Sequence, residues 1–201
     1  MNTNGKNEVE LLWQQIDFAV AQVDHRKVVL LLKKLVDLGV WQALARIGEI
    51  YELGAVDVDV NLDEAVRWYR KAVFECDDPI AHFGLGRMYF VGNAVVGKDS
   101  AASRRHLIKA YSNNVPEAGI FLGIMSMSGI DCEKDLAKAE CFFISAAQAG
   151  FPIAYRYLAY IAGSSGNFFR SKWLLLREMF LSLRLKIKDR NHPNLWKIKN
   201  G

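Results

Sequence analysis

A block of twelve residues recurs along the chain and constrains its fold more than any other feature. The block reads "ALARIGEIYELG" from Ala43, "AHFGLGRMYFVG" from Ala81, "AGIFLGIMSMSG" from Ala118 and "AYRYLAYIAGSS" from Ala154. The starts lie 38, 37 and 36 residues apart. A period of this length is typical of stacked-repeat proteins, in which each unit buries its apolar face against its neighbours.

Each block has apolar residues at helical spacing, and a second helical segment follows it, over 61–72, 99–110 and 135–146. Every second segment begins with Asn or Asp, whose side chain accepts a hydrogen bond from an unpaired backbone N–H at a helix start. Three of the four prolines lie two residues before a repeat alanine, where proline suits the first helical turn: Pro79, Pro116 and Pro152. The repeat therefore predicts a first helix (helix A), a loop of about ten residues and a second helix (helix B). No segment predicts a strand.

A small residue stands five positions after each repeat alanine, as Gly48, Gly86, Gly123 and Ala159. Glycine inside a helix costs about 1 kcal/mol relative to alanine. We expect helix B to pack so closely there that a larger side chain does not fit. A second glycine eleven positions after the alanine, first seen as Gly54, predicts the end of helix A.

The two ends of the chain depart from the repeat. Residues 8–39 predict one degenerate pair, with helices over 9–21 and 28–39. Over 168–188 the apolar residues Phe169, Trp173, Leu176, Phe180, Leu183 and Ile187 step by three and four. Leu174, Leu181 and Leu185 widen this stripe to a second face. We expect a long helix that covers the exposed end of the stack, followed by an irregular tail with Trp196 as an anchor.

The fold prediction is a single all-α domain over 1–201, built as an α-solenoid of about five helix pairs. It comprises a degenerate pair over 1–42, the repeats over 43–163, and a capping helix with a basic tail over 164–201.

The pattern A-x-x-x-L-G-x-M/Y-Y-x-x-G, then D-x-x-x-A-x-x-W-Y-x-K-A, resembles the Sel-one-like repeats, which are related to tetratricopeptide repeats. The resemblance is close over 43–163 and weak over 8–42 and 164–201. It implies a right-handed solenoid of antiparallel helix pairs, and a scaffold, adaptor or inhibitor that binds other proteins. Some family members carry a cysteine pair in every repeat, and this sequence lacks such pairs.

Composition and charge set further bounds. The chain has 201 residues and a net charge of +4. Residues 168–201 hold nine Lys or Arg and two acids, a net +7, whereas residues 1–167 have a net −3. The chain has three cysteines and no CxxC motif, which favours a protein without disulfides. It shows no apolar leader and no membrane-length segment, so we expect a cytoplasmic protein without a membrane span.

Residues that could carry catalysis or hold a cofactor have simpler structural interpretations. "GNAVVGKD" (92–99) resembles the start of a phosphate-binding loop, but Asp99 replaces the Ser or Thr that binds magnesium. The four histidines form no i,i+4 pair, which argues against a metal site. The acidic loop around Asp57 and Asp59 is interpreted as solvated, and Cys141 as a core residue. We therefore predict no enzyme, no cofactor and no metal.

The residues two, six and nine positions after each repeat alanine form a separate stripe on helix A. In the resemblance, helix A lines the concave side of the solenoid. Several stripe residues are aromatic, Met or Arg, which are enriched at interface centres. The partner-binding prediction comprises Glu49, Glu52, Phe83, Arg87, Phe90, Ile124, Met127, Arg156 and Tyr160. The alternative is that neighbouring helices partly cover this stripe.

Three functions remain open at this stage. The sharpest hypothesis is an inhibitor or immunity-type protein whose concave face occludes a bacterial toxin or effector. The second is an adaptor or chaperone scaffold for secretion or complex assembly. The third is nucleic-acid binding through a basic face of the C-terminal helix, where Arg170, Arg177 and Arg184 recur every seven residues. The alternative is that this arginine face only contacts solvent.

Overall fold

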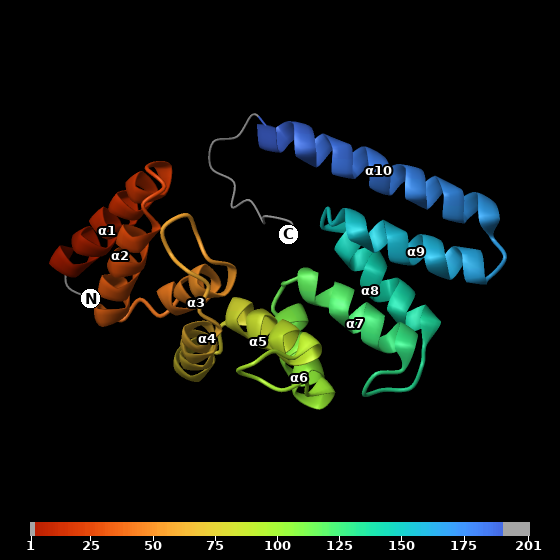
Figure 1. The fold of residues 1–201 in the computed structure, drawn as a ribbon, viewed down its shortest axis with the longest axis horizontal. Coiled ribbons are helices and arrows are strands. Elements are labelled where there is room, and N and C mark those ends of the chain that lie inside the picture. The colour runs from red at the N-terminus through yellow and green to blue at the C-terminus, as the bar shows by residue number, and fades with distance from the viewer. Residues whose placement is uncertain (1–2, 191–201) are drawn as a thin grey trace. The chain divides into compact units, whose positions relative to one another are not determined.

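The computed structural model describes residues 3–190, which form ten helices and no strand (Figure 1). Side chains are described for residues 6–185. The helices are α1 (Thr3–Ala21), α2 (His25–Asp37), α3 (Ala43–Leu53), α4 (Leu62–Cys76), α5 (Pro79–Val91), α6 (Ser100–Ser112), α7 (Glu117–Ser128), α8 (Leu136–Gln148), α9 (Pro152–Ser164) and α10 (Phe168–Arg190). They follow one another as five A and B pairs, so the predicted all-α helical-repeat class is confirmed.

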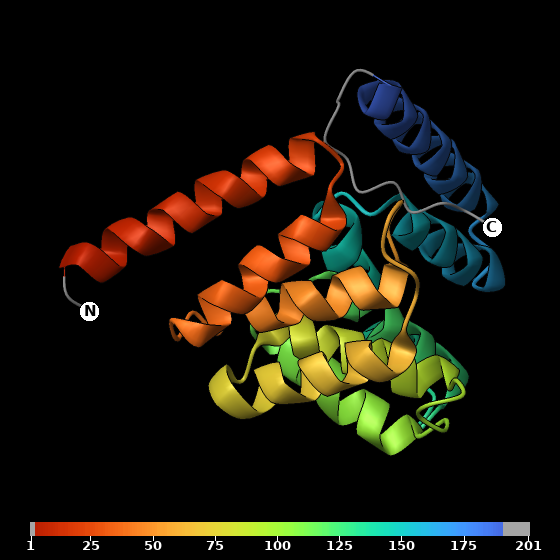
Figure 2. The same cartoon turned by 60° about the vertical axis from the view of Figure 1, so that its left-hand side comes forward.

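The described chain divides into two compact units, one ending at Leu85 and the other running from Gly86 to the end of α10. The boundary falls within α5. In the first unit, α1 lies beside α2 and α3 beside α4 (Figure 2). In the second, α7 packs on α8 and α9 on both α8 and α10. The prediction of a single domain stays a prediction.

The B helices begin at the capping residues that the sequence predicted. Asn61, Asp99 and Asp135 each accept a hydrogen bond through the side-chain oxygen from the backbone N–H three residues ahead. Each has an extended backbone, which is the usual geometry of an N-cap. The loops before these helices are slightly shorter than predicted, and the link from α9 to α10 is only Ser165–Asn167.

The small residues at offset five lie against helix B as predicted. A Cβ added to Gly48 would stand 2.7 Å from the ring of Tyr69, and one added to Gly123 would stand 2.6 Å from the ring of Phe143. Gly86 meets Leu107 in the same way, at 2.8 Å. Tyr69, Leu107 and Phe143 are almost fully buried. The glycines therefore admit one large side chain from each helix B, which forms the core between the two helices.

Gly54 ends α3 with a φ of 68°, a left-handed conformation that glycine adopts without strain. Its amide donates to the carbonyl of Ile50, as expected for a helix terminus.

The C-terminal helix packs in a way that the sequence analysis did not predict. The residues of α10 that face α9 are Ser171, Leu174, Glu178 and Leu181, of which Leu174 is only 5% exposed. The predicted covering stripe is exposed instead, from 52% at Leu176 to 91% at Phe169. The second face packs on α9 in place of the predicted stripe, because Leu174 and Leu181 join the core cluster of α8 and α9. Glu178 on the same face pairs with Arg156. Ile187 and Trp196 lie outside the described side chains.

Candidate functional site

The nine predicted partner-binding residues are called the A-helix face, and the structure places them in both units. Those in the first unit are only partly available. Glu49 is exposed, whereas Glu52 is half-buried and accepts a hydrogen bond of 2.8 Å from the Tyr69 hydroxyl. Phe83 is also half-buried. Glu52 thus helps to orient the tyrosine that fills the core between α3 and α4.

In the second unit, the α5 and α7 parts of the A-helix face have a packing role as well. The Phe90 ring meets the edge of Phe121 on α7, with ring centroids 5.4 Å apart. Ile124 and Met127 are half-buried and pack against the core cluster of α8, α9 and α10. Arg87 is half-buried, and its Nε is shielded from solvent. Neighbouring helices therefore partly cover this stripe, as the alternative interpretation expected.

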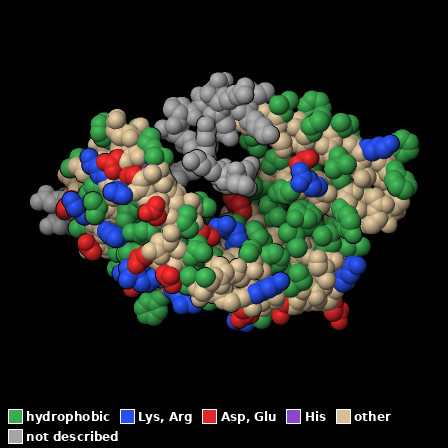
Figure 3. All heavy atoms as spheres, viewed as in Figure 1, with side chains coloured by type: hydrophobic (Ala, Val, Ile, Leu, Met, Phe, Trp, Pro, Cys, Tyr) green, Lys and Arg blue, Asp and Glu red, His purple; other side chains and the backbone are tan. Residues whose placement is uncertain are grey.

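The α9 part of the A-helix face is the most accessible. Tyr160 is 64% exposed, and Arg156 is exposed while donating a 2.8 Å hydrogen bond to Glu178 of α10. Hydrophobic side chains gather over α7 and α9 on the side shown in Figure 3. A half-buried apolar patch with an exposed tyrosine and arginine is the composition that protein-binding surfaces favour.

The three predicted arginines of α10 do not form one free basic face. Arg170 donates to Glu140 of α8. The Arg177 guanidinium lies over the rings of Tyr155 and Trp173, 5.1 and 5.2 Å from their centroids. Arg184 is exposed. Two of the three arginines therefore stabilise the packing of α10 on α8 and α9, which leaves less positive charge for a phosphate backbone.

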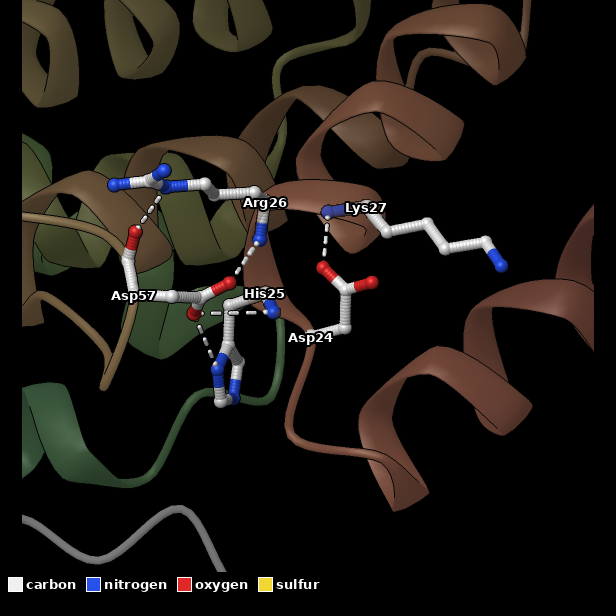
Figure 4. A network of polar contacts seen from close by, with 5 residues as sticks. All are labelled: Asp24, His25, Arg26, Lys27 and Asp57. Carbon is white, nitrogen blue, oxygen red and sulfur yellow. Dashed lines mark hydrogen bonds and ion pairs between the residues drawn. The ribbon is translucent and has the colours of Figure 1, made fainter.

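Asp57 makes a network that the sequence analysis missed (Figure 4). Its carboxylate accepts hydrogen bonds from the backbone N–H groups of His25 and Arg26, at 3.2 and 2.9 Å, and lies 3.1 Å from Nδ1 of His25. The Nε of Arg26 donates to the Asp57 carbonyl at 2.6 Å. The loop between α3 and α4 thus caps the first turn of α2, beside the local N-cap Asp24, whose carboxylate accepts from Lys27.

Partial burial raises the pKa of the Asp57 carboxyl, but hydrogen bonds from Arg26 and His25 outweigh burial and hold that pKa below its ordinary value. The prediction of a solvated acidic loop is therefore wrong for Asp57. No signal within the sequence pattern joins Asp57 to residues 31 and 32 positions earlier, because that contact depends on tertiary packing.

The remaining candidates have structural roles or none. In the 92–99 loop, Asn93 accepts from the backbone N–H of Val95 and Val96, and Asp99 caps α6. Cys141 is exposed, which corrects its interpretation as a core residue, since Phe143 takes the core position. Within residues 3–190, no group of three His, Cys, Asp or Glu side chains could hold a metal ion. None of the described helices is long and apolar enough to cross a membrane.

The sequence pattern of the Sel1 repeat matches residues 41–73, 79–115 and 116–151, which together are more than half of the chain. The chain belongs to the Sel1 repeat family. The three matched Sel1 repeats run from α3 to α8, and α9 with α10 continues the same pairing beyond them. Sel1 repeats are typically protein–protein interaction modules.

Two curated relatives match different lengths of this chain. Chitin synthase regulatory factor 3 of Schizosaccharomyces pombe is 29% identical over 160 residues, 79% of this chain and 17% of that protein. An uncharacterised protein of Neisseria meningitidis serogroup B is 32% identical over 96 residues, 48% of this chain and 20% of that protein. The chain thus spans about a fifth of these curated relatives.

Two solved structures share the fold. A Sel1 repeat protein from Oxalobacter formigenes has a TM-score of 0.65 at 22% identity, covering 76% of this chain and 61% of that one. The protective antigen c5321 of uropathogenic Escherichia coli strains has a TM-score of 0.64 at 24% identity, covering 76% of this chain and 33% of that one. These likenesses establish the helical-repeat fold alone.

Proposed function

We propose that this chain is a non-enzymatic inhibitor that binds one protein partner, of the toxin or effector type, through the A-helix face of α7 and α9. The observation that carries the proposal is Tyr160, a large aromatic side chain left 64% exposed on a helix whose other apolar residues are packed. Burying such a ring against a partner contributes several kcal/mol at the centre of an interface.

The surroundings of Tyr160 support an anchoring role. Ile124 and Met127 on α7 are held by the core cluster, so they present a pre-organised apolar surface. Arg156 is held by Glu178, which fixes its guanidinium beside α10. A surface already ordered in the free protein loses little conformational entropy on binding, which favours tight association. The regulatory role in the name of the fission-yeast relative also fits a module that acts by binding.

Affinity capture tests the proposal. The full chain is immobilised and exposed to lysate of the source cells, and bound proteins are identified and then titrated singly. We expect one partner at a 1:1 ratio with the wild type, and at least tenfold weaker binding by Tyr160→Ala. Phe74→Ala is the matched control, because Phe74 is an exposed aromatic residue on α4. Equal binding by Tyr160→Ala and the wild type would refute the assigned face.

Stoichiometry separates the inhibitor from the adaptor scaffold. An inhibitor gives one tight complex that abolishes the partner's own activity in a direct assay. Several clients bound weakly through the same face, with their activities intact, would replace the inhibitor by the adaptor. Binding to duplex DNA or RNA that weakens steeply with salt would instead favour the basic C-terminal helix.

A further inference from the structure

Helix α10 carries a broad apolar arc that the described part of the chain leaves uncovered. Among the described residues, α9 is the helix along which α10 packs extensively. The arc comprises Phe168, Phe169, Trp173, Leu175, Leu176, Met179, Phe180 and Leu183, each between 44% and 91% exposed. Soluble monomers rarely expose an apolar patch larger than a few hundred Å² without an interaction that uses it.

The repeats show what covers this face elsewhere in the chain. Eight residues after each helix B cap, Tyr69, Leu107 and Phe143 are almost fully buried. The Tyr69 ring lies against Gly84 of the following helix A, and the Phe143 ring stacks on Tyr157 of α9 with centroids 4.7 Å apart. Each helix B is thus packed between its own helix A and the next.

Leu175 holds the same position in α10. The cap of this helix is Asn167, whose side-chain oxygen accepts from the Arg170 N–H, and Leu175 follows it by eight residues. Leu175 is nevertheless 44% exposed. It lines a hollow together with Lys172, Leu176 and Met179. In α10 the neighbouring Leu174 packs on α9 instead, so the outer face around Leu175 has no helix packed on it among the described residues.

Helix α1 shows the complementary feature, because it is a helix A without a preceding helix B in the described chain. Leu12, Ile16 and Ala19 are buried on the side toward α2. Leu11 and Phe18 are 53% and 62% exposed, and their seven-residue spacing places them on one other face.

Charge distinguishes the two helices further. The described part of α1 carries Glu8, Glu10 and Asp17 against one base, Lys6. On α10, Lys172 lines the hollow and Arg184 is exposed, whereas Arg170 pairs with Glu140 and Arg177 lies over the rings of Tyr155 and Trp173. Lys172 and Arg184 are therefore opposite in sign to the acids of α1, whereas two α10 faces would bring like charges together.

We propose that the outer face of α10 binds α1 of a second copy of this chain, as the next helix A of the array. Phe18 of the second copy enters the hollow beside Leu175 and Met179, and the acids of α1 lie near Lys172. The contact is head-to-tail, so each copy offers one α1 face and one α10 face, and further copies add as concentration rises.

Two variants of the full chain test this proposal by sedimentation velocity. Phe18→Glu removes the α1 anchor and keeps α10, and Leu175→Glu with Met179→Glu does the reverse. We expect wild-type species that grow with concentration, each variant alone at monomer size, and a 1:1 mixture that forms a two-copy species and nothing larger. All three substituted side chains are exposed, and far-UV circular dichroism confirms that each variant is folded. Phe74→Glu on α4 is the control and should assemble like the wild type.

Three outcomes would overturn the proposal. A wild type that stays monomeric at every concentration, including at low salt, would show that the contact between α10 and α1 does not form. A dimer of Phe18→Glu alone indicates pairing of α10 with α10. A mixture that stays monomeric while the wild type assembles means that the contact uses other surfaces.

Discussion

Glycine inside helix A opposes local helix stability and favours the fold as a whole. At Gly86, a Cβ would stand 2.8 Å from Cγ of Leu107 and 3.2 Å from the backbone nitrogen of that residue. A leucine side chain can rotate away from such a contact, but the backbone of α6 moves only with the helix. The local loss in helix propensity is therefore offset by close approach of the two helices.

This balance determines whether a substitution at Gly86 raises or lowers the free energy of unfolding. Gly86→Ala gains about 1 kcal/mol of helix propensity and loses about 1–3 kcal/mol to overpacking, so we expect a net destabilisation of ~1 kcal/mol. Urea unfolding followed by circular dichroism measures it. Gly97→Ala is the control, because nothing lies within 4 Å of its added Cβ. A Gly86→Ala protein more stable than the wild type would refute the packing role of the glycine.

Asp57 is a second single residue that stabilises the fold, in this case through its charge. The pKa of Asp57 is lower in the folded state than in the unfolded state. The stabilisation that the carboxylate contributes is therefore fully present above the pKa of the unfolded state, about 3.9, and is lost as the pH falls through the lower pKa of the folded state. We expect Asp57→Asn to be less stable than the wild type between about pH 5 and 7, and the difference to shrink below about pH 4. Thermal unfolding across this range measures it.

Asp59→Asn is the matched control in the same loop, because Asp59 is exposed and the hydrogen bonds to His25 and Arg26 are made by Asp57. It should unfold like the wild type at pH 7. A difference between Asp57→Asn and the wild type that widens on acidification would have the wrong sign for this mechanism.

At the scale of the element, the repeat made most of the structure predictable. Helix starts followed from Asn61, Asp99 and Asp135, and close helix contacts from Gly48, Gly86 and Gly123, because these residues act through neighbours at fixed offsets. Two kinds of information were missing. The Asp57 contact joins segments without a shared pattern. Cys141 lies two residues from both Ala139 and Phe143, on the opposite side of α8 from the core, and the run of Cys141, Phe142 and Phe143 conceals which residue is buried.

Helix α10 illustrates the ambiguity of a helix that is apolar on two sides. Periodicity locates both the Phe169–Leu183 stripe and the Leu174–Leu181 side, but it does not decide which one packs on α9. The structure buries the narrower side, where Ser171 allows close approach and Glu178 pairs with Arg156. The nine residues of the A-helix face were likewise locatable, while their division into packed and exposed members required the tertiary contacts.

A pair of substitutions on α10 distinguishes its two sides. Leu174→Ala should cost about 2–4 kcal/mol in the free energy of unfolding, because Leu174 is 5% exposed within the α8–α9 core cluster. Leu176→Ala, two residues away and 52% exposed, should change it by less than about 0.5 kcal/mol. Denaturant unfolding of both variants measures the contrast, and equal costs would contradict the assigned orientation of the helix.

At the scale of the whole molecule, the Sel1 repeats supply a frame whose core positions are similar from pair to pair. Residues at offset five and at the helix B caps vary little in type, because every pair must pack on the next. The A-helix face varies from Glu49 in α3 to Tyr160 in α9, and its exposed members differ in charge and size. Under the proposed function, recognition of a partner depends on the exposed members of the A-helix face, whereas stability depends on the residues at offset five and at the helix B caps.

Oxidative footprinting of side chains in the free chain and in its complex with the captured partner tests the proposed binding face most directly. Tyr160 and Phe74 are both aromatic and exposed in the free chain, at 64% and 86%. We expect complex formation to slow oxidation of Tyr160 at least severalfold and to leave the oxidation rate of Phe74 unchanged. Protection of Phe74 with an unchanged rate at Tyr160 would contradict it, because the partner would then lie on the B helices.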